Sequence, residues 1–166
     1  MNTAQALETD QYLTFTLDEE WFAMDIRKVH EVLEFGDVTQ VPRMPPYMRG
    51  VINLRGSVVP VLDLKQKFGL GVTAKTVDTC VIITEVDLEG EAVVLGALAD
   101  SVQEVFDLEA DQIEPPPKLG TRLDTAFIQG MGKKDEEFVI LLDIDEVFTV
   151  DEVTAIKGRE EIPAAS

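Results

Sequence analysis

The chain has 166 residues, of which 32 are acidic and 14 are basic, so its formal net charge at pH 7 is −18. A charge of this sign repels phosphate backbones and anionic lipid headgroups, which excludes nucleic acid as an expected partner. Apolar residues come in runs too short for a membrane span, and the N-terminal residues lack the basic-then-apolar order of a signal peptide, so we expect one cytoplasmic domain without membrane insertion.

Short strands dominate the predicted secondary structure. Alternating apolar positions rich in β-branched and aromatic residues predict strands at 12–17, 29–35, 80–86, 92–98, 102–108 and 138–144. Two more apolar strands flank a turn within residues 50–64. Helical signals are limited to two short segments that begin at Asp63 and Asp143, each a predicted N-cap. Many strands with little helix favour barrels or a sandwich.

An internal repeat is the most informative feature of the chain. Residues 47–68 align without a gap on residues 127–148, and residues 29–35 resemble residues 102–108. Apolar character is kept at the positions that a sheet core would use. We therefore interpret the chain as two copies of one small β unit, folded as two barrels that share an interface and form a groove at their junction.

Residues for catalysis or metal binding are scarce. His30 is the single histidine and Cys80 the single cysteine, so neither a zinc site nor a CxxC motif is available. A nucleophilic site would have to pair His30 with Ser57, Ser101 or Cys80, and no known motif surrounds any of them. Cys80 is expected to be a buried, unreactive thiol. We predict no catalytic residue, no metal and no cofactor.

Acidic pairs give two further alternatives. Asp143 and Asp145 resemble the start of a calcium loop, but the required glycine is missing and Thr154 stands where a glutamate is needed, so helix capping is the better interpretation. A small acidic enzyme that uses a carboxylate pair rests only on the abundance of acids, and turnover by the purified protein would be needed to support it.

Asn53 and Arg55 lie at the turn of GVINLRGSVVPVLDL, residues 50–64. One interpretation is an exposed hairpin arginine without a role. The second copy, however, has KKDE at 133–136 in place of NLRG, so the fold does not require these residues. An arginine on a rigid strand end presents a planar fork of donors and is enriched at binding hot spots, which favours a role in a protein interface.

The same segment, followed by KQKF, resembles the signature segment of the CheW and CheW-like domain family. The resemblance extends over DIRKVHEVLEF, AVVLGALADSVQEVF, ADQIEPPP and FVILLDIDEVF, and it covers roughly residues 11–150. It implies an all-β fold of two intertwined five-stranded SH3-like β-barrels with a few short helices. Residues 11–150 are then the two-lobed domain, residues 1–10 a flexible tail, and residues 151–166 a C-terminal extension that is partly flexible.

The resemblance also implies a function. Proteins of this family are adaptors without catalysis that couple methyl-accepting chemotaxis receptors to the histidine kinase CheA. The chain has no room for a phosphotransfer, ATP-binding or receiver domain, so we expect a stand-alone adaptor, monomeric when isolated, cytoplasmic and recruited to membrane-bound receptor arrays. The alternative is a CheW-like scaffold of a related kinase pathway, such as twitching motility.

Positions that match the receptor-binding residues of the family can be named individually. They are Val29, Glu31, Val32, Gly50, Asn53 and Arg55. Arg55 is expected to be the polar anchor, and the valines are expected to cover an apolar groove that accepts the helical hairpin of a receptor. Kinase contacts are expected on loops at the far ends of the barrels, with no residue assigned.

Overall fold

The computed structural model describes residues 9–115, 125–134, 136–149 and 152, which form two five-stranded sheets. The first sheet has the strand order β8-β1-β2-β10-β9 and the second has the order β3-β6-β7-β5-β4. The strands are β1 (Thr9–Leu17), β2 (Glu20–Asp25), β3 (Val29–Glu34), β4 (Met48–Leu54), β5 (Ser57–Asp63), β6 (Cys80–Leu88), β7 (Glu91–Ala99), β8 (Ser101–Glu109), β9 (Ile128–Lys134) and β10 (Glu137–Leu142). The predicted all-β fold of two five-stranded lobes is confirmed.

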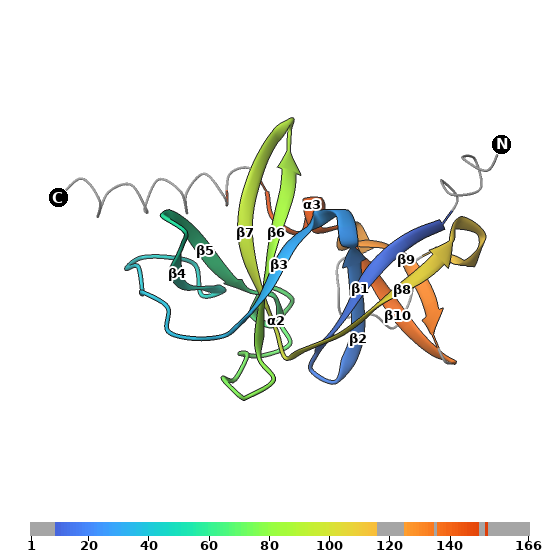
Figure 1. The fold of residues 1–166 in the computed structure, drawn as a ribbon, viewed down its shortest axis with the longest axis horizontal. Coiled ribbons are helices and arrows are strands. Elements are labelled where there is room, and N and C mark those ends of the chain that lie inside the picture. The colour runs from blue at the N-terminus through green and yellow to red at the C-terminus, as the bar shows by residue number, and fades with distance from the viewer. Residues whose placement is uncertain (1–8, 116–124, 135, 150–151, 153–166) are drawn as a thin grey trace.

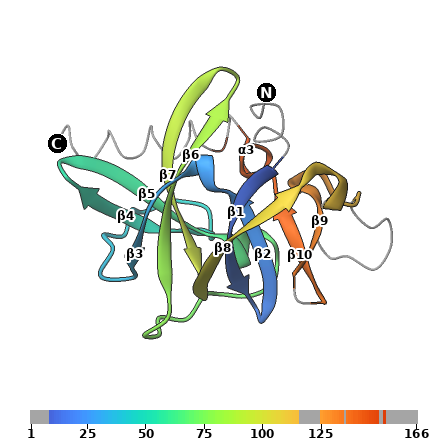
Figure 2. The ribbon, with the colours of Figure 1, turned by 45° about the vertical axis from the view of Figure 1, so that its right-hand side comes forward.

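Strands from distant parts of the chain share the first sheet. In Figure 1 the blue strands β1 and β2 lie beside the yellow-to-orange strands β8, β9 and β10, whereas the second sheet comes from one continuous stretch, β3 to β7. The lobes are therefore intertwined. In Figures 1 and 2 the hairpin of β6 and β7 projects beyond the rest of the second sheet.

The internal repeat corresponds to equivalent structure in the two lobes. The segment β4, β5 and α2 (Leu64–Lys67) has its counterpart in β9, β10 and α3 (Ile144–Val147). The Asp63 N–H donates to the Tyr47 carbonyl (2.6 Å), and the Asp143 N–H donates in the same way to the Phe127 carbonyl (2.8 Å). Each sheet also has one parallel pair, β5 with β7 and β10 with β2. The β1–β2 hairpin thus takes the place that the β6–β7 hairpin has in the other lobe.

Three apolar clusters form the core. One cluster lies inside the first sheet and includes Tyr12 and Leu141, and a second lies inside the other sheet and includes Val61 and Ile83. The third and largest joins the two sheets. Its buried members are Leu13, Phe15, Leu17, Phe22, Met24, Met48, Leu62, Leu64, Phe68, Ile82, Val86, Leu88, Val93, Leu95, Ala97, Ala99, Ile128, Leu142, Ile144, Val147 and Phe148. Because the side chains of a strand alternate between two faces, each sheet fills its own interior with one face and contacts the other lobe with the opposite face.

Aromatic residues of the repeat meet across the two lobes. The ring centroids of Tyr47 and Phe148 are 5.7 Å apart, and those of Phe68 and Phe127 are also 5.7 Å apart. Tyr47 and Phe127 are equivalent in the repeat, as are Phe68 and Phe148, so the same contact is made twice with the two lobes exchanged. The ammonium of Lys67 lies 5.0 Å from the Tyr47 ring centroid, within the range of a cation–π contact.

Four expectations need correction. The strand β2 (Glu20–Asp25) was missed, because its charged start hides the apolar residues that follow. Cys80 is half-buried rather than buried, although burial still raises the pKa of its thiol. Asp63 caps α2 by accepting from the Gln66 N–H, but Asp143 makes no such side-chain bond to α3. The strand β1 begins at Thr9, inside the tail predicted at 1–10; the rest of that tail and nearly all of the extension predicted at 151–166 lie outside the described residues.

In the described part of the chain, no helix is long and apolar enough to cross a membrane. Nor do three or more His, Cys, Asp or Glu side chains in that part gather closely enough to hold a metal ion.

Gly50 stands where two backbone segments approach closely. A Cβ added to Gly50, whose φ is +153°, would lie 2.5 Å from the carbonyl oxygen of Thr39, which accepts from the Val51 N–H in a β-bridge. We predict that Gly50→Ala lowers the free energy of unfolding by about 2–4 kcal/mol, because the backbone cannot move without breaking the bridge. Gly36→Ala, at an exposed position with open space around it, should change it by less than about 0.5 kcal/mol. Urea denaturation measures the free energy of unfolding of both variants. Equal losses would show that the close approach at Gly50 does not contribute to stability.

Glu152 ties the chain after α3 to the first repeat. Its carboxylate accepts from the Lys67 ammonium (2.6 Å) and from the Tyr47 hydroxyl (2.7 Å). Burial acts to raise the pKa of Glu152, but hydrogen bonds from Lys67, from the Thr149 N–H and from Tyr47 lower it to about 2.

The lowered pKa predicts a pH-dependent contribution of Glu152 to stability. Since the carboxylate is favoured in the folded state, its contribution of about 1–2 kcal/mol is present above pH 4.5 and is lost as the pH falls towards about 2. The difference in unfolding free energy between wild type and Glu152→Gln, measured in urea at several pH values, should therefore shrink in acid. Glu91→Gln, at an exposed hairpin position, should give a small difference at every pH. A constant difference for Glu152→Gln would contradict the ion pair.

Candidate functional site

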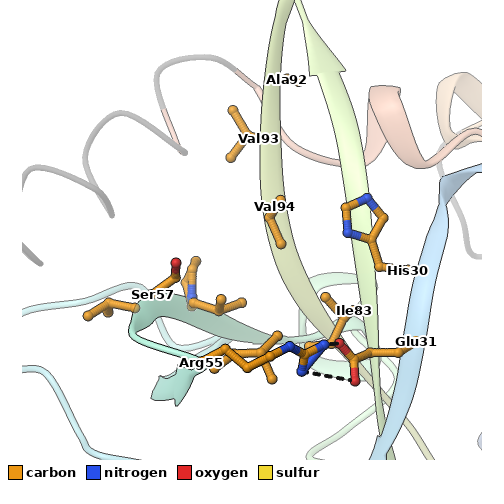
Figure 3. Close-up of a pocket in the computed structure, with 12 residues that line it drawn as sticks. His30, Glu31, Arg55, Ser57, Ile83, Ala92, Val93 and Val94 are labelled. Carbon is orange, nitrogen blue, oxygen red and sulfur yellow. Dashed lines mark hydrogen bonds and ion pairs between the residues drawn. The ribbon is translucent and has the colours of Figure 1, made fainter.

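A cavity of about 480 Å³ lies at one end of the second sheet, where the β4–β5 turn faces β3 and β7 (Figure 3). Its walls combine an apolar floor with charged residues at the edge. The lining residues are His30, Glu31, Leu54, Arg55, Ser57, Val58, Val59, Pro60, Ile83, Ala92, Val93 and Val94. Ile83 and Val59 also belong to the interior cluster of this sheet, so the cavity is the open mouth of its barrel.

The local sequence of the β4–β5 turn places Arg55 at this mouth. Leu54 pairs with Ser57, so Arg55 and Gly56 form a two-residue loop, and both have positive φ (51° and 88°) as a type I′ hairpin turn requires. The Asn53 side-chain oxygen accepts from the Gly56 N–H at 3.0 Å and stabilises the turn. Arg55 is thereby held over the cavity on a rigid hairpin.

Arg55 and Glu31 form an ion pair across the mouth. The guanidinium donates to both carboxylate oxygens of Glu31 on β3, and Figure 3 shows the pair joining the hairpin to that strand. The Arg55 side chain is 69% exposed, so most of its donor surface is open to a partner. Exposed pairs of this kind contribute little to stability, which leaves the arginine able to exchange Glu31 for another carboxylate.

The structure separates the six residues predicted to bind a receptor. Glu31 and Arg55 line the cavity. Val29 and Val32 lie on the opposite face of β3: Val29 packs against the cluster shared by the lobes, and Val32 pairs with Ile82 of that cluster. Both are partly exposed.

The other two predicted residues, Gly50 and Asn53, support the local conformation of the backbone. Gly50 is buried and permits the close approach to Thr39, and Asn53 supports the hairpin turn. Their roles in receptor binding stay predictions, and the structure gives Asn53 alone a contact with the turn that carries Arg55.

Several cavity residues were not singled out from the sequence. Val58 is 54% exposed on β5, and Val94 of β7 faces the same space. The sequence signal for Val58 was present, because it directly follows the turn within an apolar strand. Val94 comes from a strand about forty residues away along the chain, and only the pairing of β7 with β5 brings it here.

The other lobe has a large side chain where the cavity has Val94. The parallel pairs Val61–Gly96 and Leu141–Ala23 are equivalent by the repeat, so Trp21 is the counterpart of Val94. Trp21 packs against the interior cluster of its own sheet, as Val94 does in the other. An indole is much larger than an isopropyl group, so the two lobes differ in side-chain volume at this position.

The cavity that Arg55 lines is not the groove expected at the junction of the lobes. All residues that line the cavity with Arg55 come from the second sheet and its turns, so this cavity belongs to one barrel. A second cavity of about 460 Å³ lies between the lobes, as the expected groove does, because β2 of the first sheet and β6 and β7 of the second line it together. Its lining residues are Asp25, Arg27, Lys28, Glu85, Val86, Asp87, Gly90 and Ala92. There a hydrogen bond from Arg27 holds the pKa of Asp25 below its usual value.

His30 and Ser57 both line the first cavity, but they do not form a nucleophile with its base. The ring nitrogen Nε2 of His30 lies 3.2 Å from a carboxylate oxygen of Glu85, and Figure 3 shows Ser57 on the other side of the cavity. A nucleophile requires a base within hydrogen-bond reach. What the arrangement offers is recognition: an apolar wall, an accessible guanidinium paired with Glu31, and a histidine–carboxylate contact at the edge.

Comparisons with known proteins all indicate the same family. The profile of the CheW-like domain matches residues 11–152. The chain is 35% identical to the chemotaxis protein CheW of Klebsiella aerogenes over 146 residues, which are 88% of this chain and 86% of the relative. It is 30% identical to chemotaxis protein CheW of Thermotoga maritima, over 93% of this chain and 97% of the relative.

Two further similarities complete the comparison. Protein FrzA of Myxococcus xanthus is 32% identical over 117 residues, 70% of this chain and 71% of the relative. The solved structure of the scaffolding protein TtCheW from Thermoanaerobacter tengcongensis superposes with a TM-score of 0.75 at 37% identity, covering 86% of this chain and 90% of that one.

Proposed function

This chain belongs to the CheW-like domain family, and from that premise we propose that it is a non-catalytic adaptor that couples chemoreceptors to the histidine kinase CheA. It acts in the cytoplasm as a monomer that joins receptor arrays at the membrane. The cavity at the mouth of the second barrel carries the proposal, because it presents Arg55 and an apolar wall from one rigid hairpin.

The proposed receptor site uses the two features of this cavity together. An apolar side chain from one helix of a receptor hairpin enters between Val58 and Val94, and a carboxylate on the same helix replaces Glu31 as the partner of Arg55. A helix laid in a groove presents side chains three or four residues apart on one face, which suits an apolar anchor beside a charged one. Val32 is exposed on the other face of β3, so any contact that it makes with the receptor lies outside the cavity.

The alternative is a CheW-like scaffold of a related kinase pathway. The similarity to a relative named FrzA supports it, since that protein carries a name outside the CheW series. The two proposals differ in the partners recovered from the cell and share the same cavity.

Reversing the charge of Arg55 tests the anchor. We expect Arg55→Glu to weaken receptor binding about thirtyfold, as the loss of a hot-spot arginine costs roughly 2 kcal/mol, and to leave kinase binding and folding intact. Tagged wild type, Arg55→Glu and the charge-matched control Arg43→Glu, which lies outside the cavity, would be used to capture partners from native extract for mass spectrometry. Recovery of a CheA-type kinase and chemoreceptors, with only the receptors lost in Arg55→Glu, is the expected result.

Exchanging the charges of Glu31 and Arg55 distinguishes two roles of Arg55: holding the hairpin against β3 and binding a carboxylate of the receptor. In Glu31→Arg with Arg55→Glu the ion pair is rebuilt with its members exchanged. If Arg55 only holds the hairpin against β3, the swap restores receptor capture. We expect no recovery, because the guanidinium is then on β3 and away from the partner's carboxylate.

Filling the cavity tests the apolar wall independently. We predict that Val94→Trp abolishes receptor capture with little change in melting temperature, because the equivalent position of the other lobe already holds Trp21. The matched control is Val77→Trp, in a loop where the side chain is 97% exposed. Full receptor binding by Val94→Trp would contradict the location of the site.

A further inference from the structure

His30 and Glu85 form a second contact beside the ion pair made by Arg55, and this contact is an ion pair only when His30 is protonated. The Nε2 atom of His30 on β3 lies 3.2 Å from Oε1 of Glu85 on β6, and each side chain is close to half exposed. In Figure 3 His30 stands next to Glu31 along β3, on the side of the cavity that β7 borders. Both pairs are therefore within reach of one partner bound in the cavity.

A β-bulge brings His30 to this place. Val29 pairs with Thr84 and Glu31 with Ile83, so His30 is an extra residue on β3 with no partner opposite it on β6. Bulges of this kind re-aim side chains and are common beside functional sites. Here the bulge lets two consecutive residues, His30 and Glu31, line the same cavity.

The other lobe has the same bulge without the histidine. On β8, two residues lie between Val102 and Val105, whereas one residue of β1 lies between their partners, Phe15 and Leu13. The repeat matches His30 with Gln103. The fold thus requires the bulge, and a neutral amide is compatible with it, so the imidazole has no structural necessity.

Because charged groups surround His30, its protonation changes the net charge at the edge of the cavity. It faces Glu85 on β6 and adjoins Glu31, which is paired with Arg55 of the β4–β5 turn. Nearby Lys28 is paired with Asp145.

Residues 92–94 of β7 add no charge to the cavity wall. With His30 neutral, Glu31, Glu85 and Arg55 sum to −1; with His30 protonated, the sum is 0. Histidine is the side chain whose charge changes between about pH 5 and pH 8.

We propose that His30 makes partner binding in this cavity depend on pH, with tighter binding when His30 is protonated. The inference rests on the proposed function, in which Arg55 accepts a carboxylate of the receptor. Neutral His30 leaves Glu85 as an uncompensated negative charge beside that carboxylate, in a chain of net charge −18. Protonated His30 compensates Glu85, so binding strengthens as the pH falls through the titration range of histidine and weakens as the pH rises.

Calorimetric titration of the purified full chain with a soluble cytoplasmic fragment of a captured chemoreceptor tests the proposal at about pH 6 and about pH 8, at constant ionic strength. We expect wild type to bind roughly three- to tenfold more tightly at the lower pH. His30→Gln should bind weakly at both values and His30→Lys tightly at both, because their charges are fixed. Any titration of the receptor itself is present in all three and cancels in the comparison.

The matched control is Gln103→His, which places an imidazole in the equivalent bulge of the other lobe. It should keep the pH dependence of wild type, and circular dichroism checks that each variant is folded. A His30→Gln variant with the same pH dependence as wild type would overturn the proposal while leaving the proposed function intact. If wild type, Gln103→His and His30→Lys all fail to bind at either pH, the proposed function fails, and the inference fails with it.

Discussion

Burial of one face of each sheet against the other lobe is the constraint on which the rest of this structure depends. Each five-stranded sheet has a small interior of its own, and the largest apolar cluster belongs to both. A domain of this size must bury most of the surface that its unfolded chain exposes, and neither sheet does so by itself. The reciprocal ring contacts, Tyr47 with Phe148 and Phe68 with Phe127, show that this interface joins equivalent surfaces of two similar units.

The burial of these faces also determines which surfaces remain available for binding a partner. Positions that face the other lobe are committed to the core, so the turn ends of the sheets and the barrel mouths are the surfaces free to diverge between the repeats. Divergence is seen there: Val94 corresponds to Trp21, His30 corresponds to Gln103, and the NLRG turn corresponds to KKDE. Where the repeats agree, as in Asp63 at the end of β5 and Asp143 after β10, the shared residues serve the fold, because their N–H groups donate to equivalent carbonyls in the two lobes.

An adaptor needs rigidity more than reactive groups. A binding surface that is already ordered loses little conformational entropy when its partner docks. The turn that carries Arg55 is fixed by ladder pairing, by the Asn53 side chain and by the ion pair with Glu31, and the strands behind it belong to the core. The geometry of the molecule is thus suited to holding a partner in one orientation, in agreement with its membership of a family of scaffold proteins.

The sequence by itself determined the all-β class, the two-copy organisation and the segment that carries Arg55, because strand periodicity and repeats are local properties of the chain. It failed where a feature depends on partners distant in sequence. The cavity wall at Val94 and the pairing of His30 with Glu85 both follow from strand order and register. The placement of Val29 and Glu31 on opposite faces of β3 was likewise decided by a bulge, since one extra residue between them reverses the alternation of side chains. Tertiary structure therefore decided which of the predicted residues share a site.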